Sequence, residues 1–290
     1  MNRSYLFVPG DSERKLAKAI DCSADALIID LEDSVDAAER PRARQLAREF
    51  LAQSVAAELW VRINPLDSED CLPDLHAVMP SAPYGIVLPK PESATDVTQL
   101  SRHLETLERQ HGIEEGTTRI LPIATERPAA LFTMHEYARE TARLAGITWG
   151  AEDLSAALGA TANRDTDGKW LPPYVLARSL CLFAAAAARV PAIDTVYTDF
   201  RDTTGLAKSA NDARRDGFSG MLAIHPEQVP VINAAFIPAE DEVARAEKIV
   251  KMFVDNSASG VMQLDGEMID RPHFIQAKQV LDLARRSKSD

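Results

Sequence analysis

Short apolar runs alternate with longer segments of mixed polarity along most of this chain. Eight such runs follow one another, and most are continuous in hydrophobicity rather than alternating, as expected of strands buried on both faces of a parallel sheet. They span residues 4–9, 26–30, 59–64, 85–90, 119–126, 146–153, 192–197 and 220–226. The pattern therefore predicts eight buried parallel strands.

The segments between these runs are long enough for crossover helices and carry charge on one side. The clearest lie at residues 41–53, 93–110, 129–144, 174–189 and 203–215. A strand followed by a helix, repeated in this way, predicts an α/β protein with the (β/α)8 TIM-barrel fold. In that fold the C-terminal ends of the strands converge on one mouth, where catalytic residues lie.

Charged residues gather at the C-terminal ends of the predicted strands. The ends read PGD at residues 9–11, DLED at 30–33, RIN at 62–64, PKPE at 89–92, ATE at 124–126 and AED at 151–153. A charged group at the end of an apolar strand is costly unless it is paired, binds a metal or meets a ligand. We therefore expect the functional site at the mouth of the barrel.

The barrel pattern ends near Phe236, and the chain continues beyond what eight units need. We expect a barrel domain at residues 1–237 and a C-terminal helical extension at 238–290. Within the extension, the pattern predicts helices at 240–254 and 273–286, with a turn-rich stretch at 255–260. An extension of this kind is a candidate lid, or an element that reaches a neighbouring subunit.

Composition narrows the class of protein. A length of 290 residues suits one barrel with an extension, and a formal charge of -12 argues against broad nucleic-acid binding. No stretch is apolar enough to span a bilayer, and the N-terminus enters a strand without a signal-peptide pattern, so we expect a soluble, cytoplasmic protein. The three cysteines lack a metal-ligand spacing and are expected to be reduced and structural.

Seven short motifs occur in order along nearly the whole chain. They are RSYLFVPG at residues 3–10, DLEDSV at 30–35, RIN at 62–64, GAEDL at 150–154, AIDT at 192–195, AIHP at 223–226 and the segment 265–272. Each motif alone is weak, but their ordered combination resembles the HpcH/HpaI aldolase superfamily. The similarity is to its citrate lyase beta-subunit-like branch, which includes malyl-CoA and citramalyl-CoA lyases.

The resemblance implies Mg²⁺, or Mn²⁺ in its place, held by carboxylates from the fifth and sixth strands. These correspond to Glu126 and Asp153. A hard cation takes oxygen ligands and keeps positions open for the carboxylate and carbonyl oxygens of a 2-oxo acid. The alternative is that each carboxylate caps a helix or pairs with an arginine. The commoner family pattern has Glu directly before Thr, whereas Thr125 precedes Glu126 here.

Arg62 ends the third predicted strand, and the resemblance implies that it contacts oxygen atoms of the substrate. A guanidinium suits a carboxylate or a developing thioester enolate. The alternative is a buried ion pair with Glu32 or Asp33, and both roles can hold together. Glu32 and Asp33 themselves are expected to bond to metal-bound water or to Arg62 rather than to the metal. Lys90 either faces the mouth or pairs with Glu92 or another acid.

Coenzyme A is implied as part of the substrate, and a basic cluster near the N-terminus is the candidate for its phosphates. A loop at residues 9–12 leads into a predicted helix whose first turns carry Arg14 and Lys15. Backbone donors at a helix start, together with Lys and Arg, can hold phosphate groups. The resemblance suggests this role for Arg3, Arg14 or Lys15. The alternative is an ordinary solvated basic helix face.

The activity implied is that of a carbon–carbon lyase of the oxo-acid-lyase type. Such an enzyme reversibly cleaves a malyl-, citramalyl- or citryl-CoA-like thioester to acetyl-CoA and a 2-oxo acid by Claisen chemistry. Arg62 and Asp265 are the implied catalytic residues. Asp265 is either an ordinary turn residue or a base that the extension delivers to a neighbouring barrel, which implies a homotrimer or a multiple of it.

Three other functions stay open at this point. The chain could be a citrate lyase beta subunit that acts on an acyl-carrier-protein thioester, or an aldolase for free hydroxy-oxo acids. It could also be a non-catalytic barrel that binds coenzyme A or a 2-oxo acid. Turnover of a panel of thioesters with and without Mg²⁺ would separate these readings.

Overall fold

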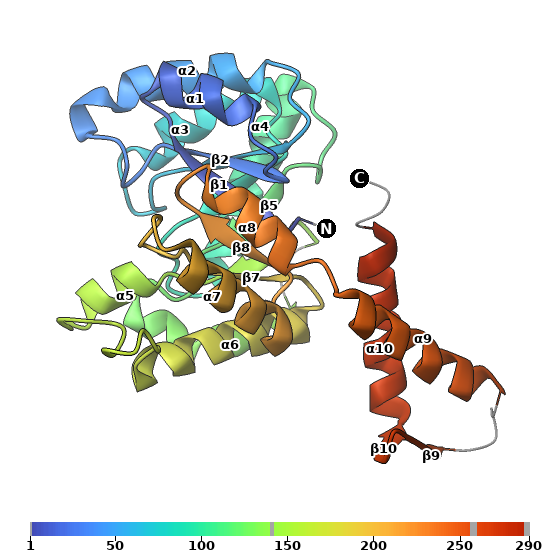
Figure 1. Ribbon diagram of the computed structural model, residues 1–290. Coiled ribbons are helices and arrows are strands. Elements are labelled where there is room, and N and C mark those ends of the chain that lie inside the picture. The colour runs from blue at the N-terminus through green and yellow to red at the C-terminus, as the bar shows by residue number, and fades with distance from the viewer. Residues whose placement is uncertain (1, 140–141, 256–259, 287–290) are drawn as a thin grey trace. The chain divides into compact units, whose positions relative to one another are not determined.

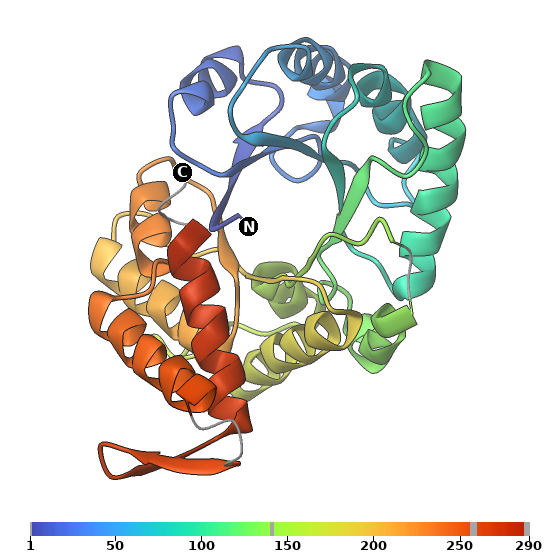
Figure 2. The same cartoon turned by 90° about the vertical axis from the view of Figure 1, so that its right-hand side faces the viewer.

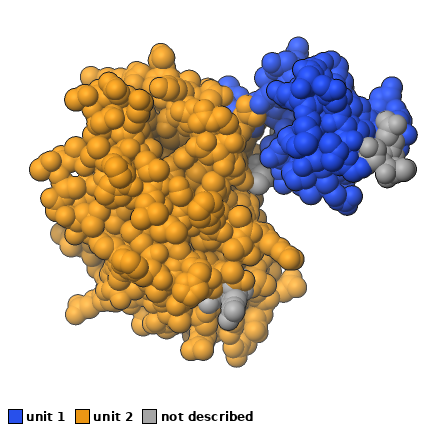
Figure 3. Space-filling view, turned by 90° about the horizontal axis from the view of Figure 1, so that it is seen from below, with its two compact units in different colours: residues 1, 234–290 blue, residues 2–233 orange. Residues whose placement is uncertain are grey.

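The computed structural model describes residues 2–139, 142–255 and 260–286. The chain forms two compact units, one covering Asn2–Asn233 and the other beginning at Ala234 (Figure 3). Their division falls within helix α8 (Gln228–Ala235), close to the boundary expected after residue 237. Among the described residues, no helix is long and apolar enough to cross a membrane.

Eight parallel strands form the frame of the first unit, in the order β5-β4-β3-β2-β1-β8-β7-β6. They are β1 (Ser4–Pro9), β2 (Ala26–Asp30), β3 (Glu58–Arg62), β4 (Gly85–Leu88), β5 (Arg119–Pro122), β6 (Ile147–Thr148), β7 (Ala192–Asp194) and β8 (Gly220–Ala223). Isolated bridges from Ile120 to Leu144 and from Ile123 to Thr148 join the two end strands, so the ring is nearly closed (Figure 2). The predicted (β/α)8 architecture is confirmed.

Helices surround the ring of strands (Figures 1 and 2). They are α1 (Glu13–Ile20), α2 (Arg40–Leu51), α3 (Cys71–Val78), α4 (Ala94–His111), α5 (Ala151–Ala157), α6 (Pro172–Ala188), α7 (Thr203–Asp216) and α8, with the 3-10 helices η1 (Ala37–Glu39), η2 (Met79–Ser81), η3 (Pro128–Phe132) and η4 (Met134–Arg139). For α4, the local sequence explains where the helix begins and ends. Ser93 and Asp96 form a capping box at its start, and Gly112 ends it with a left-handed φ of 67°.

The crossover after β5 differs from the sequence-based expectation. A helix was predicted at 129–144, but the described part of this segment forms the two 3-10 helices η3 and η4. Pro128 lacks an amide donor, and the Thr133 hydroxyl donates to the backbone oxygens of Ala130 and Glu92, both at 3.0 Å. Side-chain bonds of this kind compete with continuous α-helical pairing.

Strands β3 to β8 end before the predicted residues, and β5 and β6 differ most. β5 ends at Pro122, which has no N–H to offer the sheet, although the apolar run continues to 126. β6 comprises only Ile147–Thr148, because the Gly150 amide donates to Thr125 Oγ1 at 3.2 Å and α5 begins at Ala151. Residues 151–153 therefore start a helix instead of ending a strand.

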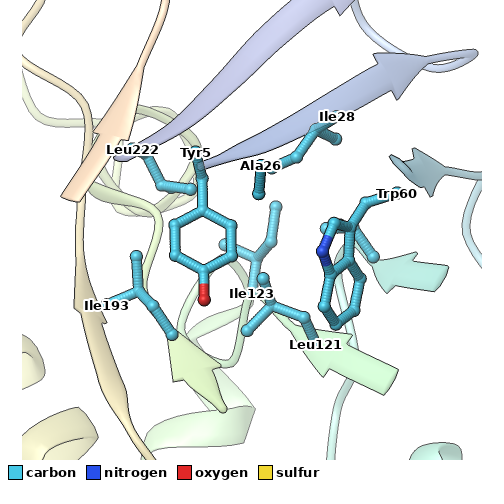
Figure 4. Packing of buried hydrophobic residues seen from close by; sticks show 9 residues of the cluster. Tyr5, Ala26, Ile28, Trp60, Leu121, Ile123, Ile193 and Leu222 are labelled. Carbon is cyan, nitrogen blue, oxygen red and sulfur yellow. The ribbon is translucent and has the colours of Figure 1, made fainter. Parts of the chain in front are cut away.

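Large apolar side chains fill the interior of the barrel. Figure 4 shows Tyr5, Trp60, Ile193 and Leu222 converging from different strands of the ring. The rings of Tyr5 and Trp60 meet edge to face, with centroids 6.5 Å apart. A Cβ atom at Gly85 would lie 2.3 Å from the Trp60 ring, so this glycine makes room for the indole. The barrel is thus a packed core that supports its mouth.

The C-terminal unit consists of α9 (Glu240–Asp255), the hairpin β9 (Val261–Leu264) and β10 (Glu267–Asp270), and α10 (Arg271–Arg286). Its helices agree with the sequence pattern, whereas the hairpin was not predicted. Asp265 and Gly266 form the turn with φ values of 52° and 85°. Two consecutive left-handed residues are typical of tight two-residue hairpins, for which Asp-Gly is a favoured pair.

A buried ion pair fixes α4 to the segment before β6. Glu108 accepts from Arg143 Nη1 at 2.7 Å and from Nη2 at 2.6 Å, and also from the amides of Gly116 and Thr118. Burial acts to raise the pKa of Glu108, but Arg143 and the two amides outweigh it and lower the pKa to about 2. The ionised carboxylate therefore stabilises the fold above its usual pKa of 4.5, and this contribution is lost as pH falls toward 2.

We expect Glu108→Gln to lower the free energy of unfolding at pH 7 by roughly 3 kcal/mol, because the change leaves the Arg143 charge buried without its partner. Urea denaturation at pH 7 and at pH 3 would measure the effect, which should shrink at the lower pH. Glu114→Gln, at an exposed position, is the matched control. An equal loss of stability at both pH values would show that the ionisation of Glu108 does not contribute to the stability of the fold.

Candidate active site

Five carboxylates and two cations meet at the C-terminal ends of β2 to β6. The carboxylates are Asp30, Glu32 and Asp33 at the end of β2, Glu126 after β5 and Asp153 in the first turn of α5; the cations are Arg62 at the end of β3 and Lys90 after β4. A cavity of about 340 Å³ opens here, and its lining includes Arg62, Glu126 and Asp153. The mouth therefore brings together acids that lie far apart in sequence.

Arg62 is held mainly by Asp30, which lies directly opposite it in the register of β2 and β3. The Asp30 carboxylate accepts from Nε and from Nη2, both at 2.7 Å. Glu32 Oε2 lies 3.0 Å from Nη1, and Asp33 only 3.5 Å from the same atom. The ion pair expected with Glu32 or Asp33 thus exists, but Asp30 is the principal partner.

Asp30 is a residue whose importance the sequence did not reveal. Its oxygens also accept the amides of Glu32 and Ser34, at 3.0 and 3.1 Å. Burial acts to raise the pKa of Asp30, yet Arg62 and these amides outweigh burial and lower it, so the carboxylate stays ionised. The sequence did contain one indication: Asp30 is an acid in the last position of a buried strand. A charge there is costly unless a partner of opposite charge or a hydrogen-bond donor is close.

Lys90 lies among the acids of the mouth and not beside Glu92. Its ammonium bonds to Glu32, lies 3.0 Å from Asp33 Oδ1 and is 3.3 Å from Asp153 Oδ1. Glu92 instead accepts from Arg127 Nη1 at 3.0 Å. The Lys90 backbone, in the left-handed region with a φ of 51°, donates its N–H to Glu126 Oε2 at 2.5 Å. Lys90 therefore contacts carboxylates that follow three different strands: β2, β5 and β6.

Glu126 is buried almost completely, with 3% of its surface exposed. Burial, followed by the charges of Asp153 and Glu32, raises the pKa of Glu126 well above its usual value. A Cβ atom at Gly150 would lie 2.6 Å from Glu126 Cγ, so only glycine leaves space for this side chain. The fold thus accommodates a carboxylate that is costly to ionise without a cation nearby.

Glu32 adds to the surplus of negative charge. Burial raises its pKa to about 7, despite the opposing effect of Arg62 and Lys90. Its Oε2 is buried and makes no hydrogen bond within the described region, although Arg62 lies within ion-pair distance. Five carboxylates against two cations leave the mouth with too few positive charges, and a divalent cation would correct this.

The donor set at the mouth fits Mg²⁺. Glu126 and Asp153 supply hard oxygen atoms from adjacent strand ends, and the cavity beside them leaves room for water or substrate oxygens. Within the described ranges, no group of three or more His, Cys, Asp or Glu side chains forms a closed cage for a metal. A site with two protein carboxylates and open positions is the kind that Mg²⁺ uses with anionic substrates.

Trp149 forms part of the cavity wall. The indole is fully buried, and its Nε1 donates to Asp194 Oδ1 at 2.6 Å. Asp194 in turn accepts from Arg178 Nη2 at 2.8 Å. Because Trp149 directly precedes Gly150, this anchor fixes the start of the segment that carries Asp153.

The three candidates for coenzyme A lie at opposite ends of β1. Arg14 and Lys15 are exposed on the first turn of α1, which follows β1 on the mouth side. Arg3 precedes β1, and its guanidinium pairs with Asp25 at 2.7 Å before β2 begins. The length of β1 therefore separates Arg3 from the mouth, and a role for Arg3 in binding coenzyme A stays a prediction.

Asp265 belongs to the C-terminal unit. It is exposed in the hairpin turn, with Arg245 Nη1 lying 3.8 Å from its Oδ2. Arg245 also pairs with Glu267 on β10. The catalytic role of Asp265 stays a prediction.

Known proteins are similar to this chain over nearly its whole length. Residues 3–226 match the family model described as HpcH/HpaI aldolase/citrate lyase. Citrate lyase subunit beta of Haemophilus influenzae is 35% identical over 289 residues, covering 98% of this chain and 97% of that protein. Mitochondrial citramalyl-CoA lyase of Rattus norvegicus is 29% identical over 300 residues, covering 99% and 87%.

A solved structure is similar along the whole chain. The crystal structure of protein CitE from Mycobacterium tuberculosis, in complex with magnesium, acetoacetate and coenzyme A, has a TM-score of 0.84 and 32% identity. The match covers 98% of each chain. The chain therefore belongs to the HpcH/HpaI aldolase/citrate lyase family and is a carbon–carbon lyase of the oxo-acid-lyase type.

Proposed function

We propose that this chain is a Mg²⁺-dependent lyase that reversibly cleaves a 3-hydroxyacyl-CoA thioester to acetyl-CoA and a 2-oxo acid. The substrate is of the malyl-, citramalyl- or citryl-CoA type. The observation that carries the proposal is the placement of Glu126 and Asp153 beside Arg62 in one cavity. The similar structures and relatives, which include a citramalyl-CoA lyase and a complex with magnesium and coenzyme A, support the same chemistry.

Glu126 and Asp153 would hold Mg²⁺, which supplies a Lewis acid for the carboxylate and hydroxyl or carbonyl oxygens of the substrate. Arg62 uses Nε and one N–H of Nη2 on Asp30, and Nη1 faces Glu32 and Asp33, so the second N–H of Nη2 remains for a substrate oxygen. The thioester oxygen, on which negative charge develops when the C–C bond breaks, accepts from this donor. Asp30 keeps the guanidinium plane fixed during this step.

We assign the proton transfer to Asp265. As the base, it takes the proton of the substrate's 3-hydroxyl group, and the electrons of the breaking C–C bond pass to the thioester enolate. The protonated Asp265 then returns a proton to the enolate carbon to give acetyl-CoA, and the former carbinol carbon becomes the carbonyl of the 2-oxo acid. Asp265 lies on an exposed hairpin turn of the C-terminal unit, which is suited to entering a barrel mouth.

We further propose a homotrimer, or a multiple of it, in which the C-terminal unit of one chain completes the barrel site of another. The exposed position of Asp265 outside the barrel unit motivates this assembly. For coenzyme A, Arg14 and Lys15 are the proposed phosphate contacts, because both are exposed on the mouth side and have no ion pair within the described part of the chain.

A thioester panel tests the proposal. Malyl-, citramalyl- and citryl-CoA would each be incubated with the protein, with and without Mg²⁺, and acetyl-CoA and the 2-oxo acid would be quantified. We expect turnover of at least one thioester, lost on chelation and restored by Mg²⁺. If none is cleaved although Mg²⁺ binds, the proposed substrate class is wrong.

One alternative function has specific support. The relative from Haemophilus influenzae is named as a citrate lyase subunit beta, so this chain could act on citryl attached to an acyl carrier protein. Comparing citryl-CoA with a citryl-carrier-protein substrate separates the two carriers. Cleavage of free hydroxy-oxo acids, or binding of coenzyme A without turnover, would favour the remaining alternatives.

Arg62→Lys should reduce kcat by about 10²- to 10³-fold, the usual effect of removing a donor to a developing oxyanion. An ammonium cannot bind Asp30 through two parallel bonds and also present a donor to the substrate. Steady-state kinetics on the best thioester would measure the loss, with Arg42→Lys, at an exposed position, as control. Near-normal turnover would leave Arg62 with a structural role only.

A further inference from the structure

Lys90 is a residue of the mouth to which the proposed reaction gives no role. It lies in the loop after β4, between Pro89 and Pro91, and its backbone is left-handed with a φ of 51°. This conformation is unfavourable for a residue other than glycine, and it persists only where the surrounding structure holds it. Here the Lys90 N–H donates to Glu126, one of the two proposed metal ligands. The loop therefore fixes Lys90 beside the metal site.

Three carboxylates surround the Lys90 ammonium. It bonds to Glu32, lies 3.0 Å from Asp33 Oδ1 and is 3.3 Å from Oδ1 of Asp153, the second proposed ligand. Because one nitrogen atom reaches all three, Glu32 and Asp33 are close neighbours of Asp153. Burial and the charge of Asp153, followed by the charge of Glu32, raise the pKa of Glu126, so Glu32 also lies close to the first ligand.

Glu32 and Asp33 are therefore placed to compete as metal ligands. Mg²⁺ binds an octahedral set of oxygen atoms, and the proposed substrate needs positions for its carboxylate and for its hydroxyl or carbonyl oxygen. Each further carboxylate on the metal would remove one of these positions. Charge-assisted bonds to Lys90 engage both acids instead. This agrees with the finding that, among residues 2–139, 142–255 and 260–286, no three His, Cys, Asp or Glu side chains form a metal cage.

Arg62 can replace Lys90 only in part. Its Nη1 lies 3.0 Å from Glu32 Oε2 but 3.5 Å from Asp33 Oδ2, and its Nε and Nη2 bind Asp30. The Asp33 side chain is 50% exposed, whereas that of Glu32 is 4% exposed. Without Lys90, Asp33 would therefore be the freer of the two acids to turn toward a cation.

The charge of Lys90 also acts on the metal directly. A divalent cation on Asp153 would lie near an ammonium that is 3.3 Å from the same carboxylate. Only 22% of the Lys90 side chain is exposed, so water screens this repulsion incompletely. Lys90 should therefore weaken the binding of Mg²⁺ while it keeps coordination positions open.

We infer that Lys90 is a positioning residue of the proposed reaction, which keeps Glu32 and Asp33 off the metal and so reserves open positions of Mg²⁺ for the 2-oxo acid. The inference rests on the proposed function, because it takes Glu126 and Asp153 as the ligands. It adds a reason why a mouth with five carboxylates would coordinate the metal through only two of them.

Isothermal titration calorimetry on the wild type and on Lys90→Met would test this role. Mg²⁺ is titrated first, and pyruvate, a simple 2-oxo acid, is then titrated into the protein saturated with Mg²⁺. In Lys90→Met we expect Mg²⁺ to bind about tenfold tighter or more, because a repelling charge is lost and further carboxylates reach the metal. Pyruvate should bind about tenfold more weakly or worse, because those carboxylates occupy its positions. Damage to the fold would instead weaken both.

Three further variants sharpen the test. Lys90→Arg keeps the positive charge and should lie closer to the wild type than Lys90→Met in both affinities. The triple variant Lys90→Met/Glu32→Gln/Asp33→Asn lacks the competing acids, so its Mg²⁺ affinity should return to the wild-type value or below. Lys208→Met, at an exposed position on α7, is the matched control and should change neither affinity.

The outcomes separate this inference from the proposed function. If the wild type binds no Mg²⁺, both fail together. If the wild type binds Mg²⁺ and pyruvate, but Lys90→Met binds Mg²⁺ no tighter or pyruvate no more weakly, only the role of Lys90 is overturned. Tight Mg²⁺ binding that persists in the triple variant would likewise overturn it, since Glu32 and Asp33 would not be the acids that Lys90 restrains.

Discussion

Glu126→Gln and Asp153→Asn should each abolish measurable Mg²⁺ binding and reduce kcat by about 10³-fold or more, since a metal's stabilisation of developing charge is worth several kcal/mol. Each change removes one negative oxygen donor of the proposed pair and leaves an amide of nearly the same shape. Burial, Asp153 and Glu32 raise the pKa of Glu126, so a neutral group at this position should not destabilise the barrel. Calorimetry with Mg²⁺ and thermal unfolding would be measured on the same samples.

The matched control for both variants is Glu152→Gln. Glu152 neighbours Asp153 on α5, but it accepts a bond from Asn163 at 2.8 Å and makes no ion pair with Arg62 or Lys90 within the described residues. We expect this variant to bind Mg²⁺ as the wild type does. Unchanged Mg²⁺ affinity in both Glu126→Gln and Asp153→Asn would remove the ligand assignment, whatever happened to turnover.

Asp265→Asn should reduce kcat by about 10²- to 10⁴-fold, the range for loss of a general base, and a second inactive variant should rescue it. The partner is Arg62→Ala, which has a defective barrel and an intact extension. If each site combines the barrel of one chain with the extension of another, random mixing in equal amounts gives roughly a quarter of the sites both intact parts. We therefore expect mixtures to recover up to about that fraction of wild-type activity.

The control mixture combines Asp265→Asn with the double variant Arg62→Ala/Asp265→Asn, which carries no intact extension and should stay inactive. Native mass spectrometry would establish that subunits exchange and report the size of the oligomer. Exchange without recovered activity would rule out a shared site. Full activity of Asp265→Asn alone would instead show that another group is the base.

The sequence predicted most strands and helices because hydrophobic pattern and end signals agreed. β1 and β2 begin and end at the predicted residues, and the capping box at Ser93 marks the start of α4. The segment after β5 was predicted wrongly because its helical pattern competes with Pro128 and with the side-chain bonds of Thr133. Those bonds depend on the neighbouring Glu92 backbone, which a local pattern does not contain.

The acids and cations of the mouth could be predicted from strand ends, but their pairing could not. Asp30 meets Arg62 because parallel register places them opposite each other, and register is a property of the assembled sheet. Lys90 reaches Asp33 and Asp153 for the same reason. Arg3 and Arg14 are close in sequence but far apart in the fold. Strand β1 lies between them, so the two residues stand at opposite ends of that strand.

The ring of strands is weakest where β5 and β6 meet. β6 has only two residues, and isolated bridges replace a continuous ladder along this seam. Glu126 follows β5 and Asp153 follows β6, so a cation held by both would fasten the two sides together. Closing the barrel and binding the metal would then be thermodynamically linked, and Mg²⁺ would add to the free energy of unfolding by RT ln(1 + [Mg²⁺]/Kd). The cation would thus act on the architecture of the barrel as well as on the substrate.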